Sequence, residues 1–127
     1  MGLDMHLMAA KSMKELNEMT WNDWTEWEDV CDKYDGDYTM LERPCAVWYA
    51  RKFWDMVREM SFLKDYNDKC GEFIRIHKKD LREMIDFYCY HPDYFDGFNG
   101  LPRLCELYQA FDAMEDAGIN LYFEADW

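Results

Sequence analysis

Basic residues are scarce in this sequence, which has 14 Lys and Arg against 27 Asp and Glu and a formal net charge of -13 at pH 7. Double-stranded nucleic acid is held mainly by Lys and Arg side chains that neutralise its phosphates. A surface this acidic also repels anionic membranes. The composition therefore argues against direct binding to nucleic acid or membranes, and it favours either a basic protein partner or simple solubility.

Long apolar segments are missing as well. No apolar run approaches the roughly 20 residues that a helix needs to span a bilayer. The first residues, from Met1 to Asp4, lack the basic and apolar regions of a signal peptide. The cysteines are odd in number and never spaced as CxxC, which is typical of reduced thiols. They are Cys31, Cys45, Cys70, Cys89 and Cys105. These absences predict a soluble protein of the cytoplasm.

The motifs that hold phosphates and metals are also missing. Neither GxxxxGK[ST] nor GxGxxG is present, so a glycine-rich phosphate-binding loop is not expected. An EF-hand loop counted from Asp32 would need oxygen ligands where Tyr34 and Gly36 stand. A zinc site needs Cys and His at paired short spacings, whereas Cys70 and His77 lie seven residues apart. We therefore expect no bound metal and no cofactor.

Apolar and aromatic residues, in contrast, are abundant. The chain of 127 residues is 50% hydrophobic and 18% aromatic, so it can bury a core as a single domain over residues 1–127. Ten Met and six Trp supply large, adaptable side chains for a core or an interface. Disordered chains are poor in these residue types.

The stretch from Cys70 to Tyr90 shows the plan of the fold most clearly. Residues 73–76 have the composition of a short, largely buried strand. From Lys79 or Asp80 the apolar period changes to that of a helix. The residues predicted for its buried face are Leu81, Met84, Ile85 and Tyr88. This stretch predicts a strand that leads directly into an amphipathic helix.

Strands are also predicted near both ends of the chain. Leu3, Met5 and Leu7 alternate with polar residues, which is the pattern of a half-buried strand. Residues 119–123 alternate in the same way. After the first strand, Ser12 and Glu15 form a possible capping box for a short helix.

Two longer helices complete the expected pattern. One is predicted to begin at Pro44 and to bury Val47, Ala50, Trp54 and Val57. The other is predicted to begin at Pro102 and to end at Gly118 in the left-handed conformation. The fold class expected is α+β, with a small, mainly antiparallel sheet of N-terminal, central and C-terminal strands packed by three or four helices.

The stretch from Thr20 to Asp37 is acidic and rich in Trp. Spacings of three and four place its aromatic residues on one face of a predicted helix. One interpretation is a solvated helix whose Trp residues anchor it to the sheet. The other is an interaction surface, in which carboxylates imitate a row of phosphates and exposed Trp residues anchor the partner. The candidate partner-binding residues are Trp21, Asp23, Trp24, Glu26, Trp27, Glu28, Asp29, Asp32, Asp35 and Asp37.

Two other functions remain open from the sequence. A small enzyme or metal-dependent protein could use Cys70, His77 and His91, with His6 as an alternative to His77 beside the thiol. Carboxylates are so numerous that no pair stands out for acid–base chemistry, so no catalytic residue is assigned. Alternatively, the aromatic content suits a scaffold that forms homo-oligomers.

Several short segments resemble a family of small uncharacterised phage and prophage proteins. The first seven residues, MGLDMHL, are similar to that family's opening M-G-L-D-M-Y-L, and Trp48–Lys52 is similar to its W-x-x-R-K-A-N segment. Further similarities are Cys70–Phe73, Asp96–Phe98 and the C-terminal residues 121–127. His6 stands where the family has Tyr, and Phe53 where it has Ala.

The resemblance implies a phage-encoded protein of the host cytoplasm. A phage origin favours a host-directed inhibitor, such as an anti-CRISPR or other anti-defence protein. Together with the charge, it implies a basic host protein as the partner, nucleic-acid-binding proteins included.

Overall fold

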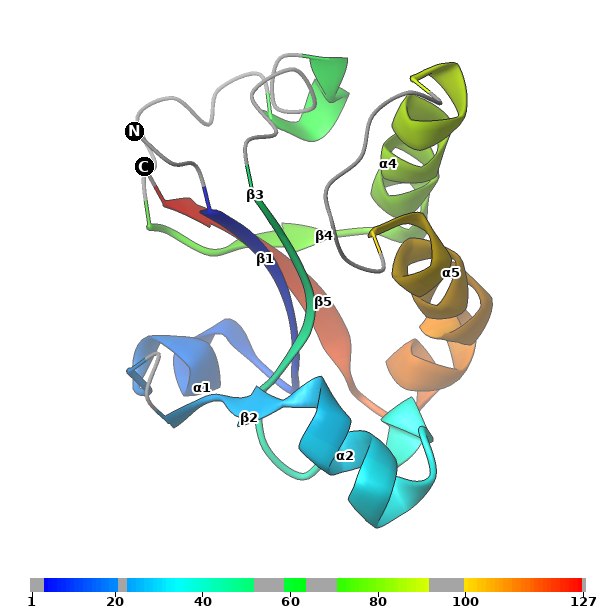
Figure 1. The fold of residues 1–127 in the computed structure, drawn as a ribbon. Helices are drawn as coiled ribbons and strands as arrows, with labels where there is room; N and C mark the ends of the chain where they lie inside the picture. Colours follow the sequence, from blue (N-terminus) through cyan, green and yellow to red (C-terminus); the bar gives the residue numbers. More distant parts are fainter. Residues whose placement is uncertain (1–3, 21–22, 52–58, 64–70, 92–99, 127) are drawn as a thin grey trace.

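The fold is organised around one mixed β-sheet with helices on both of its faces (Figure 1). The computed structural model describes residues 4–20, 23–51, 59–63, 71–91 and 100–126. Within these residues the strands are β1 (Asp4–Ala10), β2 (Thr25–Glu26), β3 (Cys45–Arg51), β4 (Ile74–Ile76) and β5 (Asn120–Asp126). The helices are α1 (Met13–Asn17), α2 (Trp27–Tyr34), α4 (Lys78–Tyr90) and α5 (Gly100–Asp116), with short 3-10 turns η2 (Tyr38–Met40) and η3 (Ser61–Leu63). The predicted α+β class is confirmed.

The sheet order is β2-β3-β1-β5-β4, which places the first strand of the chain at its centre. β1 is antiparallel to both β3 and β5, and β4 is antiparallel to β5. Only the short β2 runs parallel to its neighbour among the described strands. The strands predicted at the two ends therefore pair with each other, with Asp4 opposite Asp126 and His6 opposite Glu124.

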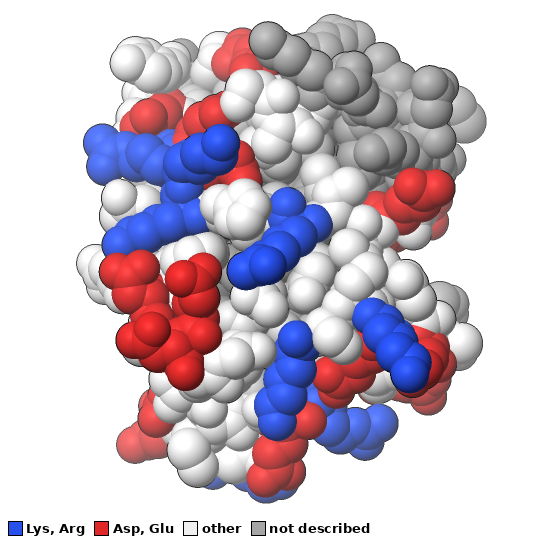
Figure 2. Space-filling view, turned by 180° about the vertical axis from the view of Figure 1, so that it is seen from behind, with Lys and Arg blue, Asp and Glu red and all other residues white. Residues whose placement is uncertain are grey.

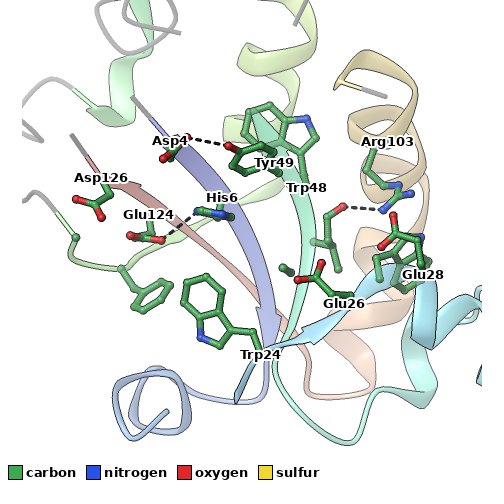
Figure 3. Close-up of a pocket in the computed structure, with 15 residues that line it drawn as sticks. Asp4, His6, Trp24, Glu26, Glu28, Trp48, Tyr49, Arg103, Glu124 and Asp126 are labelled. Carbon is green, nitrogen blue, oxygen red and sulfur yellow. Dashed lines mark hydrogen bonds and ion pairs between the residues drawn. The ribbon is translucent and has the colours of Figure 1, made fainter. Parts of the chain in front are cut away.

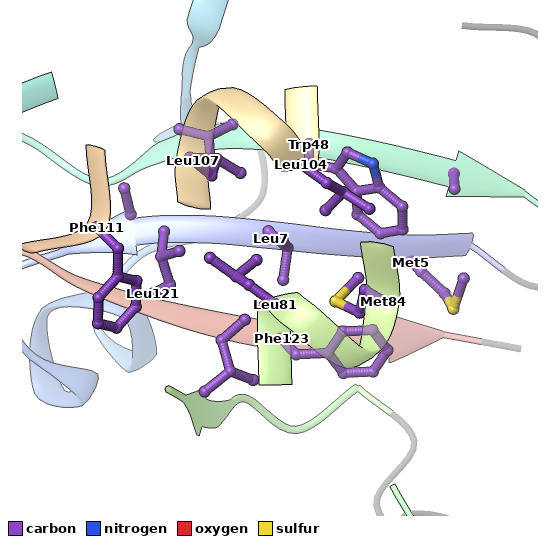
Figure 4. Close-up of a cluster of buried hydrophobic side chains, with 14 of the residues drawn as sticks. Met5, Leu7, Trp48, Leu81, Met84, Leu104, Leu107, Phe111, Leu121 and Phe123 are labelled. Atoms are coloured by element: carbon purple, nitrogen blue, oxygen red, sulfur yellow. The ribbon is translucent and has the colours of Figure 1, made fainter. Parts of the chain in front are cut away.

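Alternation along β1 divides the buried residues between the two faces of the sheet. Met5 and Leu7 belong to the main core, which α4 and α5 cover (Figure 4). Met8 belongs to a smaller cluster on the opposite face, where it packs with Leu16 of α1 and Tyr122 of β5. Because α1 has only five residues, it covers only part of that second face.

The strand-to-helix unit predicted at residues 70–90 is confirmed over its described part, residues 71–90. β4 is followed at once by α4, and the side chains of Leu81, Met84 and Tyr88 are buried as expected. The buried Asp80 carboxylate accepts a hydrogen bond from the backbone N–H of His77 at 2.6 Å, which satisfies a donor at the helix N-terminus.

The last helix also follows its prediction, and within the described residues α5 runs from Gly100 to Asp116. Gly118 has φ 80° and ends it, while the backbone N–H of Ile119 donates to the carbonyl of Met114 at 2.9 Å.

Lys78 of α4 and Asp112 of α5 form an ion pair at 3.0 Å. Figure 2 shows the molecule from behind, and on that face Lys and Arg side chains are interspersed with Asp and Glu.

The helix predicted from Pro44 is wrong over residues 45–51, which form the strand β3. The helical spacing of Val47 and Ala50 arises from a β-bulge, because Leu7 pairs with Trp48 while the next residue, Met8, pairs with Ala46. The bulge inserts Val47, so that both Val47 and Ala50 join the main core. The remainder of the predicted helix, residues 52–58, lies outside the described residues.

The prediction that Trp21, Trp24 and Trp27 share one helical face is also wrong for the part that is described. Residues 25–26 form β2, and α2 begins only at Trp27. Trp27 is 4% exposed and stacks on Tyr38 at 4.1 Å, whereas Trp24 packs with the smaller cluster on the other face of the sheet. The Trp residues thus serve two different packing layers. Trp21 lies outside the described residues.

Candidate functional site

A cavity of about 780 Å³ lies over the part of the second sheet face that α1 leaves uncovered (Figure 3). β1, β3 and β5 form its floor, while residues 24–28 and 71–73 contribute walls. Arg103 of α5 stands at its far end, beyond the edge of β3 (Figure 3). A volume of this size is ordinary for a ligand site.

The change in side-chain polarity along β1 and β5 explains why this half of the sheet face is open. Toward α1 the face carries Met8 and Tyr122, which are buried in the smaller apolar cluster. Farther from α1 the same alternation presents His6, Glu124 and Asp126 to the cavity. The sequence therefore changes from an apolar floor that a helix covers to a polar floor that faces the cavity.

His6 and Glu124 are cross-strand partners at the centre of this floor. The Nδ1 atom of His6 and the Oε2 atom of Glu124 are 3.3 Å apart, and Figure 3 shows the two side chains pointing toward each other. Both atoms are buried, and neither has a hydrogen-bond partner among the described residues, since their mutual geometry is not that of a hydrogen bond. Glu124 is only 7% exposed, so an acidic group is enclosed here with one oxygen unsatisfied.

Aromatic rings enclose this pair. The ring of Trp24 meets the His6 ring edge-on with centroids 5.5 Å apart, and the ring of Tyr49 lies 5.0 Å from it. Phe73 adds a second edge-to-face contact with Trp24 at 6.0 Å. The Tyr49 hydroxyl donates a hydrogen bond to Asp4 at 2.8 Å, which holds that ring at the cavity.

Carboxylates dominate the charge of the cavity. Glu26 and Glu28 line it from the segment that begins α2, and they add to the carboxylates of β1 and β5. Arg103 is the one Lys or Arg among the described lining residues. Its guanidinium already pairs with Glu106 at 3.2 Å and donates to the Val47 carbonyl at 2.9 Å. The cavity is thus suited to a cation rather than to an anion.

The structure divides the predicted partner-binding residues into two groups. Trp24, Glu26, Trp27 and Glu28 line the cavity, although Trp27 does so from a buried position. The other described members do not line it and are exposed. They are Asp23, Asp29, Asp32, Asp35 and Asp37. The hypothesis that Trp27 is an exposed anchor is wrong, because Tyr38 stacks on one side of its ring and the Arg103 guanidinium lies 5.3 Å from the ring centre.

Hydrogen bonds fix the two ends of this acidic stretch. The Asp23 carboxylate accepts from the backbone N–H of Thr20 at 3.1 Å and from its hydroxyl at 2.9 Å, and these bonds lower the pKa of Asp23. At the other end, Asp37 accepts from the backbone N–H of Thr39 at 3.0 Å. Both carboxylates are held at defined positions on the surface.

Sequence reasoning did not identify the floor of the cavity. Glu124 and Tyr49 were not among the predicted site residues, and His6 was considered only as a partner of Cys70. The available signal was a pair of polar residues that alternate with apolar ones in each terminal strand. These residues lie at positions 4 and 6 in β1 and at positions 124 and 126 in β5. That signal becomes specific only once the two strands are known to pair in this register.

The alternative site at Cys70, His77 and His91 is not assembled in the described part of the chain. His77 precedes the first residue of α4 and His91 follows its last, so the helix of 13 residues separates them. The length of that helix is about 20 Å. Cys70 lies outside the described residues. Nowhere among the residues that the structure describes do three or more His, Cys, Asp or Glu residues lie where they could hold a metal ion.

Comparison with known proteins gave no relative: no family model, no curated protein and no solved structure matches the chain. In the described parts of the chain, no helix combines the length and the apolar character that crossing a bilayer requires.

Proposed function

We propose that this protein acts by binding a basic protein surface. The binding element is the acidic face, defined as the exposed carboxylates of Asp23, Glu26, Glu28, Asp29, Asp32, Asp35 and Asp37. One observation carries the proposal. Residues 23–37 hold these seven carboxylates against a single base, Lys33, and all seven are exposed.

The packing of α2 supports this proposal because it determines which side of the helix faces outward. Trp27 and Val30 are buried, so Glu28, Asp29 and Asp32 are left on the solvent side. Glu28 and Asp32 lie one turn apart, about 6 Å along the helix axis. Glu28 and Asp29 also lie in the first helical turn, where the helix dipole favours negative charge.

The acid excess is smaller in the other described helices: α5 carries four acids and one base, an excess of three, against the excess of six in residues 23–37. α4 carries three bases and three acids. Cross-element ion pairs join Lys78 to Asp112 and Arg75 to Glu115. A basic partner is therefore attracted to the acidic face, and carboxylates arranged in this way steer association with a basic target.

The resemblance to small phage proteins supports a more specific form of the proposal. In that form the chain is a phage-encoded inhibitor that occupies the nucleic-acid groove of a host protein, as anti-defence proteins of the nucleic-acid-mimic type do. A carboxylate surface of this kind competes with phosphates for the same Lys and Arg side chains. Added duplex DNA is then expected to displace the captured partner.

The test uses two variants of equal charge. In the first, Glu26, Glu28, Asp29 and Asp32 are changed to Lys; in the second, the same change is made at four exposed acids outside the acidic face. These controls are Glu18, Asp112, Glu115 and Asp116. Each variant has a net charge of -5, because four changes of +2 are added to -13. Capture of a partner from host lysate is measured for both variants and for the wild type.

The first variant is expected to lose capture and the second to keep it. Lys at the start of α2 opposes the helix dipole and could destabilise the helix by itself. A companion variant therefore carries the neutral residues Gln and Asn at the same four positions, 26, 28, 29 and 32. Circular dichroism verifies that each variant is folded. Equal capture by the wild type and the folded companion variant would refute the proposal, as would equal loss in both Lys variants.

A further inference from the structure

We propose that the cavity over His6 and Glu124 binds an organic cation, with the Glu124 carboxylate as its counter-ion and the rings of Trp24 and Tyr49 as its walls. The ligand class is an alkylammonium or a guanidinium group. This inference rests on the proposed function in one respect: a Lys or Arg side chain of the basic partner is one source of such a group, and a free amine is the other.

The first observation is the incomplete environment of Glu124. Its Oε2 atom is buried without a hydrogen bond, and His6 Nδ1 lies 3.3 Å away without the alignment that a hydrogen bond needs. His6 lies at ion-pair distance from this carboxylate, but a buried oxygen that accepts no hydrogen bond loses solvation without full compensation. The Glu124 side chain is 10% exposed, and Glu124 lines the cavity. A cation in the cavity would supply the missing charge.

The second observation is the aromatic wall beside this carboxylate. Trp24 and Tyr49 both lie within 6 Å of the His6 ring, on the side of the sheet that carries Glu124. A cation within about 6 Å of an aromatic ring centre is attracted by the face of the ring. Carboxylates and aromatic rings around one cavity are the combination that binds organic cations.

The donor set distinguishes this ligand from a metal ion. A metal site needs several oxygen, nitrogen or sulfur ligands at short distances from one point. The described residues contain no such group of three, and aromatic rings of Trp24 and Phe73 form part of the walls here. An organic cation needs only one or two carboxylates, since the rings and apolar atoms contact its alkyl part.

The third observation is continuity with the acidic face. Glu26 and Glu28 belong to that face and also line the cavity. A long basic side chain from a partner bound to the acidic face would therefore reach the cavity without leaving a negative surface. For a free amine, the same carboxylates would raise its local concentration at the cavity mouth.

The experiment titrates the full chain with n-butylguanidinium, n-butylammonium and the neutral isostere n-butylurea, followed by NMR shifts of backbone amides and Trp indoles. Both cations are expected to cause saturable shifts around Glu124 and Trp24, whereas n-butylurea is not. Glu124→Gln removes one charge and retains the shape, and it is expected to weaken cation binding at least about tenfold. Asp116→Asn, which makes the same charge change at an exposed position of α5, is the matched control and is expected to bind as the wild type does.

Trp24→Leu is a second variant that leaves the sheet itself unchanged, and it is expected to weaken binding about threefold to tenfold. The inference is overturned if n-butylurea binds as well as n-butylguanidinium, if folded Glu124→Gln binds as the wild type does, or if no probe saturates up to its solubility. Agmatine and a blocked Arg tripeptide then distinguish the two sources. Binding of both supports a partner side chain, and binding of agmatine alone supports a free amine.

The two proposals fail separately. Glu124→Gln leaves the acidic face unchanged, so loss of cation binding with retained partner capture supports this cavity as a site for free amines. Capture that is equal in the wild type and the folded Gln and Asn companion variant, together with the expected cation shifts in the wild type, refutes only the proposed function.

Discussion

Replacing Trp27 with Ala is expected to destabilise the protein strongly, because this residue packs in the core. Trp27 is 4% exposed, stacks nearly parallel on Tyr38 at 4.1 Å and lies under the Arg103 guanidinium. Truncating a buried Trp to Ala costs about 3–5 kcal/mol. Since domains of this size are stable by about 5–15 kcal/mol in total, the loss is a large fraction of the free energy of unfolding.

The measurement is urea unfolding followed by far-UV circular dichroism, which does not depend on the remaining Trp residues. With an m-value of roughly 2 kcal/mol/M, the midpoint should fall by roughly 2 M urea. Trp27→Phe retains the stacking on Tyr38 and is expected to lose less. Tyr90→Ala is the matched control, because Tyr90 is 81% exposed and a surface change of this kind stays within about 0.5 kcal/mol.

This experiment separates two interpretations of the acidic, Trp-rich stretch. If Trp27→Ala unfolds at the wild-type midpoint but loses partner capture, Trp27 is an exposed anchor and the packing described for α2 is refuted. If stability falls as expected, partner binding through α2 must depend on its carboxylates.

Three further predictions concern single residues. Burial raises the pKa of the Cys45 thiol to about 12 from 9.0, so the thiol deprotonates at lower pH in the unfolded chain than in the folded one. The free energy of unfolding should therefore fall between about pH 9 and pH 12. Urea titrations should show a shallower fall with pH for Cys45→Ala than for the wild type, and an identical pH dependence would contradict this origin. Asp80→Ala removes the acceptor of the His77 N–H and should cost about 1–2 kcal/mol, measured by the same titration against Asp80→Asn. Gly118→Ala should cost about 1 kcal/mol because φ is 80°, and a neutral result would show that the helix end rearranges.

The elements that could be predicted from the sequence are those whose pattern follows one regular period. β1, β5, α4 and α5 each contain a stretch with a period of two or 3.6, and they were located to within a few residues. β3 was mistaken for a helix because the bulge at Val47 breaks its alternation and produces a spacing of three. β2 was missed because two residues are too short for any period.

The candidate site illustrates a different limit of sequence reasoning. The acidic face lies in one continuous segment, so its carboxylates could be selected from composition alone. The cavity floor is formed by residues more than 100 positions apart, His6 and Glu124, which meet only through the register of β1 with β5. Nothing local specifies that register, because it depends on which faces of both strands the helices cover.

On the second face of the sheet, the observed side chains are not the ones that would give the greatest stability. An apolar pair in place of His6 and Glu124 would extend the cluster around Met8 and remove an unsatisfied buried oxygen, which costs about 1–3 kcal/mol. A cation bound beside Glu124 offsets that cost only in the bound state, and by mass action it stabilises the folded chain. Sites where a fold retains such a cost tend to be functional ones. The enclosed carboxylate is therefore better explained by a ligand than by the fold, and binding should be sought at the cavity and the acidic face that adjoins it rather than at the buried Trp27.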